Sequence, residues 1–242
     1  MSRLLYFRHA QASYGKADYD QLSDKGYVQS DHLGNHLIIN EVEFSAVYVG
    51  PLKRHRQTLE RVQEAYDRAG ADFPEPIEMK ELEEHRGPEV LKRVLHILKD
   101  EDELIGKWET ERQADKDLFV KNGLLIFDRA MELWATGALD HHHPDEFLKW
   151  KDFRKQVQRG YNEILDRHRN KRNQTVGLFT SGGTISATMG EVLGIEKDRN
   201  VIRLNGIVQN TSISEVLFSG PRVTLKSFNE VHHLPDELKT FV

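Results

Sequence analysis

Short apolar runs alternate along this chain with longer segments in which apolar residues recur every three or four positions. A continuous apolar run is typical of a strand buried on both faces of a parallel sheet, and the recurring spacing is typical of an amphipathic helix. We therefore predict strands over residues 4–7, 44–49, 175–179, 213–218 and 223–228, and helices over 23–37, 55–69, 157–168 and 184–193. The last two strands flank a Ser-Gly-Pro turn and should form a hairpin.

Individual residues mark where these elements begin and end. Ser23 suits the N-cap of the first helix, because its hydroxyl can accept a backbone N–H of the first turn. Gly50 and Pro51 should stop the second strand. Gly70 and Gly194 should end two helices, since glycine tolerates the left-handed conformation that follows many helices. Strands that alternate with helices predict crossover connections and a largely parallel sheet.

The pattern changes between residues 88 and 172. Residues 99–117 are strongly charged, and the apolar residues from Leu124 to Trp134 keep helical spacing. We interpret this region as an α-helical insertion that forms a cap over the functional site. No repeat, low-complexity linker or Gly/Ser-rich boundary is found, so we predict a single α/β domain over residues 1–242.

Composition and charge narrow the class of protein. Lys and Arg total 34 and Asp and Glu total 39, so the formal charge is 34 − 39 = −5 at pH 7. This balance excludes a globally basic coat, and we expect no nucleic-acid partner. The absence of cysteine excludes disulfides, thiolate zinc sites and a cysteine nucleophile. The first apolar run is too short for a signal peptide, and no stretch could span a membrane, so we expect a cytoplasmic protein without membrane contact.

Polar clusters directly follow three of the predicted strands, at residues 8–11, 51–56 and 180–184. Ligands of open α/β sheets bind beyond the carboxyl ends of the strands, so these clusters should converge. Guanidinium groups and the N-terminal N–H groups of a helix match phosphoryl oxygens. A histidine held among cations stays neutral and keeps a nucleophilic lone pair. For any one cluster alone, surface ion pairs and a satisfied strand-end histidine are the favoured explanation, but three clusters at equivalent strand ends predict a phosphoryl-binding site.

These clusters resemble the motifs of the histidine phosphatase, or phosphoglycerate mutase-like, superfamily. The family's Arg-His-Gly-Glu/Gln motif reads Arg8-His9-Ala10-Gln11 here. Its Ser-Pro-Leu-x-Arg-x-x-x-Thr motif corresponds to residues 50–58, GPLKRHRQT, and residues 19–26 are similar to the start of its first helix. The resemblance implies a phosphoglycerate mutase-like α/β fold, with a mostly parallel central sheet flanked by helices.

The resemblance also implies site residues. His9 would be phosphorylated in a covalent intermediate, while Arg8 and Arg54 would hold the phosphoryl oxygens and offset charge in the transition state. Further phosphate-binding candidates are Gln11, Ser181 and Gly182.

The family's proton donor is a glutamate in a Leu-x-Glu stretch, which Leu82-Glu83-Glu84 supplies. We assign Glu84 this role, with Glu83 in reserve. The resemblance implies neither a metal ion nor an organic cofactor. Histidines 141–143 are consecutive and lack suitably spaced partners, so we interpret them as a polar loop.

Two of the departures from the family motifs bear on the expected activity. The later motif Ser-His-Gly-Gly-Thr reads Thr-Ser-Gly-Gly-Thr over residues 180–184, so Ser181 replaces a second histidine. Serine donates one hydrogen bond without positive charge, and losing such a donor typically lowers the rate by about 10²–10³. Candidates for compensation are Arg56, His55 and His233. Ala10 replaces a glycine, which is mild where the backbone avoids positive φ.

We therefore predict a phosphatase that hydrolyses a small phosphomonoester through a phosphohistidine on His9. The alternative is a phospho-ligand-binding or regulatory protein whose catalytic power was lost with Ser181. Phosphomutase action is less favoured, because no second substrate site can be identified. The sequence identifies neither the physiological substrate nor the oligomeric state.

Overall fold

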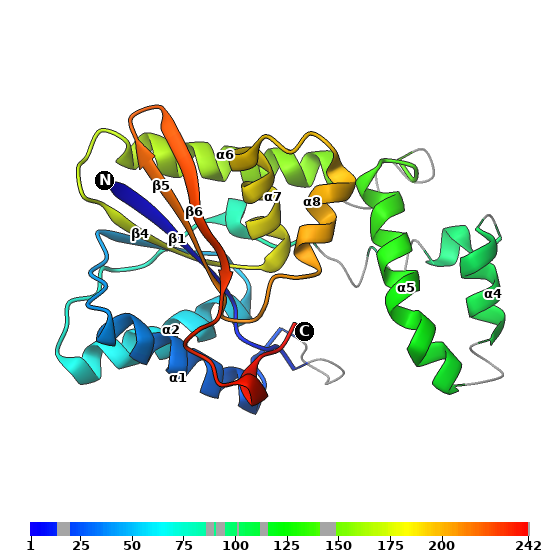
Figure 1. Cartoon of the computed structure of the whole chain (residues 1–242), viewed down its shortest axis with the longest axis horizontal. Helices are drawn as coiled ribbons and strands as arrows, with labels where there is room; N and C mark the ends of the chain where they lie inside the picture. Colours follow the sequence, from blue (N-terminus) through cyan, green and yellow to red (C-terminus); the bar gives the residue numbers. More distant parts are fainter. Residues whose placement is uncertain are drawn as a thin grey trace.

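A six-stranded sheet lies at the centre of the computed structural model, which describes residues 1–13, 20–85, 90, 95–100, 102–111, 116–140 and 149–241 (Figure 1). Its strands are β1 (Ser2–Arg8), β2 (Ala46–Val49), β3 (Ile77–Glu78), β4 (Thr175–Thr180), β5 (Ile213–Ser219) and β6 (Arg222–Glu230). They lie in the order β3-β2-β4-β1-β5-β6. The first four strands run parallel to one another, and β5 and β6 form an antiparallel hairpin at one edge. The predicted mostly parallel α/β fold is confirmed.

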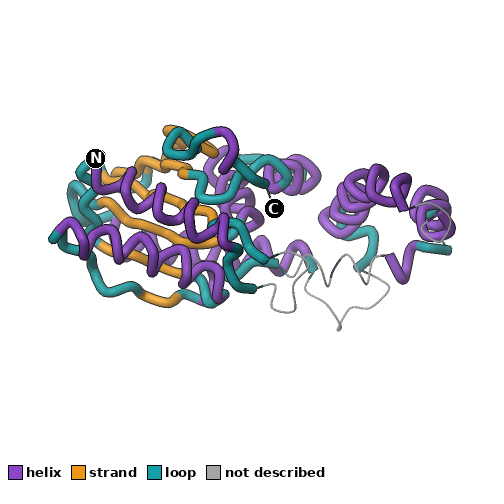
Figure 2. The backbone as a smooth tube through the Cα atoms, turned by 90° about the horizontal axis from the view of Figure 1, so that it is seen from below, coloured by secondary structure: helices purple, strands orange, loops and turns teal. Residues whose placement is uncertain are grey.

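Helices cover both faces of this sheet. The helices of the described residues are α1 (Asp24–Ile39), α2 (Lys53–Ala69), α4 (Glu103–Glu111), α5 (Lys116–Ala135), α6 (Trp150–His168), α7 (Gly182–Leu193) and α8 (Asp198–Asn205), with short 3-10 turns η1 (Lys80–Leu82) and η2 (Asp236–Leu238). Helices α1 and α2 lie across one face, as Figure 2 shows, and α6 and α7 pack on the other. The sheet is therefore the middle layer of three.

The alternation of side chains along β1 fixes this central strand between the two helical layers. Leu5 and Phe7 are buried with apolar residues of α1 and α2, whereas Leu4 and Tyr6 are buried with residues of α6 and α7. Full burial of such a side chain contributes roughly 1.5–3 kcal/mol. The strand end that carries Arg8 is thus held rigidly.

The predicted caps are present. The Ser23 hydroxyl accepts a hydrogen bond from the N–H of Gly26 at 3.0 Å. Gly70 and Gly194 each follow a helix with φ of 63°, in the left-handed region. Helices α2 and α7 begin two residues earlier than predicted, because their first turns carry polar residues outside the apolar spacing. The short elements β3, η1, α8 and η2 were not predicted.

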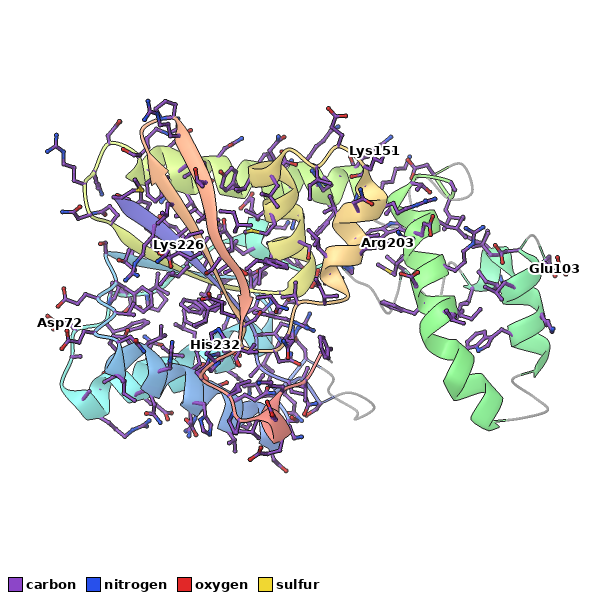
Figure 3. All side chains as sticks on the ribbon, in the orientation of Figure 1. Asp72, Glu103, Lys151, Arg203, Lys226 and His232 are labelled. Carbon is purple, nitrogen blue, oxygen red and sulfur yellow. The ribbon has the colours of Figure 1, made fainter. Side chains whose placement is uncertain are left out.

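Within the described residues, the predicted insertion is mostly helical. Its earlier helices, α4 and α5, and its last helix, α6, lie in different places. Helices α4 and α5 extend away from the sheet (Figures 1 and 2), so that Glu103 lies far from Lys226 of β6 in Figure 3. Helix α6 instead buries Tyr161 and Ile164 against the sheet. The part that leaves the α/β core is therefore narrower than residues 88–172. Within the described residues, no helix combines the length and apolarity that crossing a membrane needs.

Candidate active site

Hydrogen bonds tie together the carboxyl ends of the parallel strands. The N–H of His9, just after β1, donates to the carbonyl of Thr180 at 2.8 Å, and the N–H of Gly50, just after β2, donates to that of Phe179 at 3.0 Å. The hydroxyl of Thr180 donates to the carbonyl of Leu82 at 2.7 Å. All the sequence motifs therefore meet at one edge of the sheet, where the strand-end clusters were predicted to converge.

The ring of His9 is held by both of its nitrogens. Nδ1 lies 2.7 Å from the carbonyl oxygen of Ala10, and since a carbonyl only accepts, Nδ1 carries the proton. Nε2 therefore has a lone pair, which accepts a hydrogen bond from Nε of Arg54 at 3.2 Å. The unprotonated nitrogen of this buried imidazole thus faces a guanidinium, and their hydrogen bond must be released before the lone pair can attack a phosphoryl group.

Burial lowers the pKa of His9 well below its ordinary value, and the positive charges of Arg54 and Arg8 lower it further. His9 is therefore neutral at pH 7. This agrees with the expectation that a histidine among cations keeps its lone pair.

Arg54 is positioned by a residue that the sequence did not single out. Asp20 accepts a hydrogen bond from Nη1 of Arg54 at 2.6 Å, and its other oxygen accepts the N–H of Lys53 at 2.8 Å. Asp20 thereby also binds the positive N-terminal end of α2. The guanidinium, 8% exposed, is held between this carboxylate and the ring of His9.

Arg8 lies beside the first residue of α7. Its Nη1 donates to the carbonyl oxygen of Val208 and, at 2.7 Å, to that of Phe241. A Cβ on Gly182 would lie 3.6 Å from Nε of Arg8 and only 2.5 Å from the side-chain oxygen of Asn205. The glycine at position 182 therefore lets the side chain of Asn205 lie against the start of this helix, beside Arg8.

Glu84 reaches the same helix from the opposite side. Its carboxylate accepts a hydrogen bond from the N–H of Gly183 at 3.1 Å. Glu83 instead contributes its backbone carbonyl, which accepts from the hydroxyl of Thr184 at 3.3 Å and from the amide of Gln156 at 3.1 Å. Of the two glutamates, Glu84 is therefore the one whose carboxylate lies at the first turn of α7. It contacts Gly183, which follows Gly182, the residue beside Arg8.

His85, which belongs to none of the sequence motifs, links this glutamate to the helical insertion. Its Nε2 lies 3.3 Å from the carboxylate of Glu84 and 3.3 Å from the amide nitrogen of Asn205. Its ring centroid lies 5.0 Å from that of Trp134 and 5.3 Å from that of Phe153. The insertion therefore contacts the site through aromatic side chains at the ends of α5 and α6.

The side chain of Ser181 contacts His55, which was one of the three candidates for compensation. Its hydroxyl lies 2.6 Å from Nε2 of His55, and both side chains are fully buried. The ring centroid of His55 lies 5.7 Å from that of His9. Among the candidates for compensation, His55 is thus the one adjacent to both Ser181 and His9. Ala10 avoids positive φ, so the glycine of the family motif is not needed there.

The remaining candidates are Gln11, Arg56 and His233, and their contacts described below are with residues other than His9. Gln11 accepts a hydrogen bond from the hydroxyl of Ser23 at 2.9 Å, at the start of α1. Arg56 forms an exposed ion pair with Glu78 at 2.7 Å. His233 lies 3.1 Å from the hydroxyl of Thr211. Within the described part of the chain, these contacts of Arg56 and His233 do not bring the two side chains to the ring of His9.

A metal-ion site is not formed by the residues that the structure describes, since no group of three or more His, Cys, Asp or Glu is placed to hold one. Histidines 141–143 lie outside the described residues. The expectation that the site needs neither metal nor cofactor stays a prediction.

Several buried or partly buried histidines share a lowered pKa. Burial is the largest cause for His9, His55, His85 and His233, and it lowers the pKa of His233 to about 3. Each ring therefore stays neutral in the folded protein at a pH where an unfolded histidine takes up a proton.

We expect the free energy of unfolding to fall as the pH drops below about 6.5. The unfolded chain then binds more protons than the folded one, and each buried histidine contributes a slope of about 1.4 kcal/mol per pH unit until its folded-state pKa is reached. Urea denaturation at about pH 7 and about pH 5 measures this loss. The His233→Asn variant serves as the control, because its slope should be shallower by one histidine. Equal stability at both pH values would contradict the prediction.

Comparison with known proteins agrees with this geometry. A family model of the histidine phosphatase superfamily (branch 1) matches residues 4–117 and 126–231. Solved structures with the same fold include a phosphoserine phosphatase mutant from Entamoeba histolytica, with a TM-score of 0.61, 16% identity and coverage of 97% of this chain and 100% of that one. Among curated proteins, no sequence matches significantly.

Two further structures extend the comparison. YhfR from Bacillus stearothermophilus has a TM-score of 0.63 and 20% identity, over 96% of this chain and 99% of that one. A phosphoglycerate mutase from Bacillus anthracis has a TM-score of 0.61 and 14% identity, over 96% and 94%. These likenesses confirm the phosphoglycerate mutase-like fold. Since the family model spans nearly the whole sequence, the chain belongs to branch 1 of the histidine phosphatase superfamily.

Proposed function

We propose that this protein is a phosphatase that hydrolyses small phosphomonoesters through a phosphohistidine on His9. The observation that carries the proposal is the contact of 3.2 Å between Nε of Arg54 and Nε2 of His9. The nucleophilic lone pair and a donor for the phosphoryl oxygens are thereby adjacent, while Nδ1 is fixed on Ala10.

The first step transfers the phosphoryl group to the protein. Nε2 of His9 attacks phosphorus, and the ester P–O bond breaks as the N–P bond forms. Arg8, Arg54 and the N–H of Gly182 hold the three equatorial oxygens, whose charge is spread in the transition state. Glu84 acts as the general acid and gives a proton to the leaving oxygen, so the product leaves as an alcohol.

The second step returns the protein to its starting state. Glu84, now a carboxylate, removes a proton from a water molecule that attacks the phosphohistidine. The N–P bond breaks, inorganic phosphate leaves, and the lone pair returns to Nε2 of His9. Histidine is a suitable carrier, because its neutral ring is a good leaving group once phosphorus accepts the water oxygen.

The substrate class rests on the relatives. Structures of the Entamoeba histolytica phosphoserine phosphatase hold phosphoserine or 3-phosphoglyceric acid, and another neighbour is a mycobacterial glucosyl-3-phosphoglycerate phosphatase. These compounds support a small phosphorylated molecule as the substrate here.

Turnover of an aryl phosphate, followed by alkaline quenching and peptide mass spectrometry, tests the proposal. We expect release of inorganic phosphate and a transient phosphoryl group on the peptide that contains His9. Binding of orthovanadate without turnover would instead favour the alternative, a phospho-ligand-binding protein that has lost catalytic power.

We expect Glu84→Gln to lower kcat by about 10²–10⁴ for an alkyl phosphate, because a poor leaving group needs a proton as it departs. An aryl phosphate with an acidic leaving group should lose much less. Glu83→Gln is the matched control and should stay close to the original protein for both substrates, since its backbone makes the contacts with α7 and Gln156. The reverse pattern in the two variants would assign the proton donor to Glu83.

A further inference from the structure

Two departures from the family motifs meet at one side chain. Position 50 is serine in the motif and glycine here, and position 181 is histidine in the motif and serine here. Both positions contact His55. A Cβ on Gly50 would lie 2.3 Å from Nδ1 of His55, closer than real contacts allow, so the glycine makes room for the ring. The serine at 181 makes room for its other end.

The imidazole of His55 therefore lies beside the place where the family's second histidine begins, although it comes from α2 instead of the start of α7. Its Nε2 lies 2.6 Å from the hydroxyl of Ser181. The hydroxyl is not used to cap α7, although Ser181 is the N-cap residue of that helix. Its contact is with the ring instead, at the end of β4 where the motifs converge.

The proton of the His55 ring belongs on Nε2. Nδ1 is buried and faces the backbone of Gly50 without forming a hydrogen bond of normal geometry among the described residues. A proton there would have only this poorly placed acceptor, and a poorly satisfied buried N–H is rarer in folded proteins than a bare acceptor. With the proton on Nε2, the ring donates to the oxygen of Ser181, and the hydroxyl hydrogen of Ser181 can point to another acceptor.

We propose that His55 and Ser181 together supply the hydrogen bond that the family's second histidine gives to the phosphoryl group. Ser181 is the residue that touches the phosphoryl oxygen, and His55 is a positioning residue that acts through it. A donated hydrogen bond polarises the hydroxyl and strengthens its own donation. This inference rests on the proposed function, because it describes how the same site holds its phosphoryl group.

The charge on the pair agrees with this role. Burial lowers the pKa of His55 well below its usual value, and the neighbouring Arg54 lowers it further. The ring is then neutral at pH 7, and Arg8 and Arg54 supply the positive charge of the site. The His55–Ser181 pair therefore replaces the hydrogen-bond donor of the missing histidine but does not replace a positive charge.

Two substitutions at position 55 separate this role from packing alone. His55→Gln keeps an N–H donor that can reach Ser181, and His55→Leu fills the space without a donor. We expect kcat for an aryl phosphate to fall by about 10²-fold in His55→Leu with little change in KM, and by less than about tenfold in His55→Gln. Equal kcat in the two folded variants would overturn the proposal.

Ser181→Ala removes one atom and gives an answer even if a variant at position 55 does not fold. We expect a loss of about 10²-fold in kcat, and no further loss when His55→Leu is added, since both changes break the same relay. Unchanged kcat in Ser181→Ala would overturn the proposal. The exchange variant His55→Ala with Ser181→His should recover most of the rate that His55→Ala loses.

Orthovanadate binding keeps this test separate from the test of the function. If the original protein does not turn over aryl phosphates, the proposed phosphatase function fails. The affinity for orthovanadate, a mimic of the phosphoryl transition state, then still reports on the pair. We expect Ser181→Ala and His55→Leu to weaken vanadate about 10²-fold and inorganic phosphate much less. Equal affinities in all variants would overturn the inference.

Discussion

Replacing His9 with alanine is expected to lower kcat for an aryl phosphate by on the order of 10⁶, which is the largest effect we predict. In the proposed mechanism His9 supplies the nitrogen of the N–P bond, so the covalent route would be closed in this variant. Initial rates of phosphate release and the loss of the phosphorylated peptide measure the effect.

Binding should survive this change. Arg8 and Arg54 are held by Phe241 and Asp20, respectively, so the phosphate-binding donors stay in place without the imidazole. We expect inorganic phosphate to bind His9→Ala within about tenfold of its original affinity. His96→Ala, on the exposed surface of the insertion, is the control for loss of any histidine and should not change the rate. A His9→Ala variant with residual turnover above that of unrelated proteins would refute the covalent mechanism.

Arg54→Ala should have the second largest effect, a loss of about 10³–10⁵ in kcat. The variant removes a charge that stabilises the transition state and also the N–H that orients the lone pair of His9. Arg54→Lys should recover only part of this loss, because an ammonium group cannot contact Asp20 and His9 in the same planar geometry.

Arg61→Ala is the matched control for this prediction. Arg61 also lies on α2 and also pairs with an aspartate, Asp31, at 2.7 Å, but this contact ties α2 to α1 away from the site. We expect a small loss of stability and an unchanged kcat. Comparable losses of activity in Arg54→Ala and Arg61→Ala would show that stability, not chemistry, explains both.

The fold was predictable wherever burial imposes a period on the sequence. Strands β1 and β4 are buried on both faces and read as unbroken apolar runs, while Gly70 and Gly194 stop their helices by a backbone preference that is local. The limits of the insertion were not predictable, because α6 has one apolar stripe that serves two clusters. Trp150 and Phe153 pack with the insertion, and Ile164 packs with the sheet.

The site was predictable as far as its residues sit in motifs at strand ends. Arg8, His9, Arg54 and Glu84 share one edge of the sheet because parallel strands bring their carboxyl ends together. Contacts made by single residues far apart in sequence, such as Asp20 with Arg54, have no local signal.

Nearness in sequence was misleading for Arg56. Two positions along a helix correspond to a rotation of about 200°, so Arg56 faces away from Arg54 and pairs with Glu78. His55 is separated from Arg54 by half that rotation and faces Ser181. The side of the helix, not the distance along the chain, decides which neighbour of Arg54 reaches the site.

The anchoring of Arg8 has a consequence for the synthesis of the protein. The carbonyl groups of Val208 and Phe241, which hold its guanidinium, come 200 and 233 positions later in the chain. Residues up to Phe241 must therefore be synthesised before both carbonyl groups can bind the guanidinium. We therefore expect Arg8 to reach its described position only after the segment that carries Phe241 has docked.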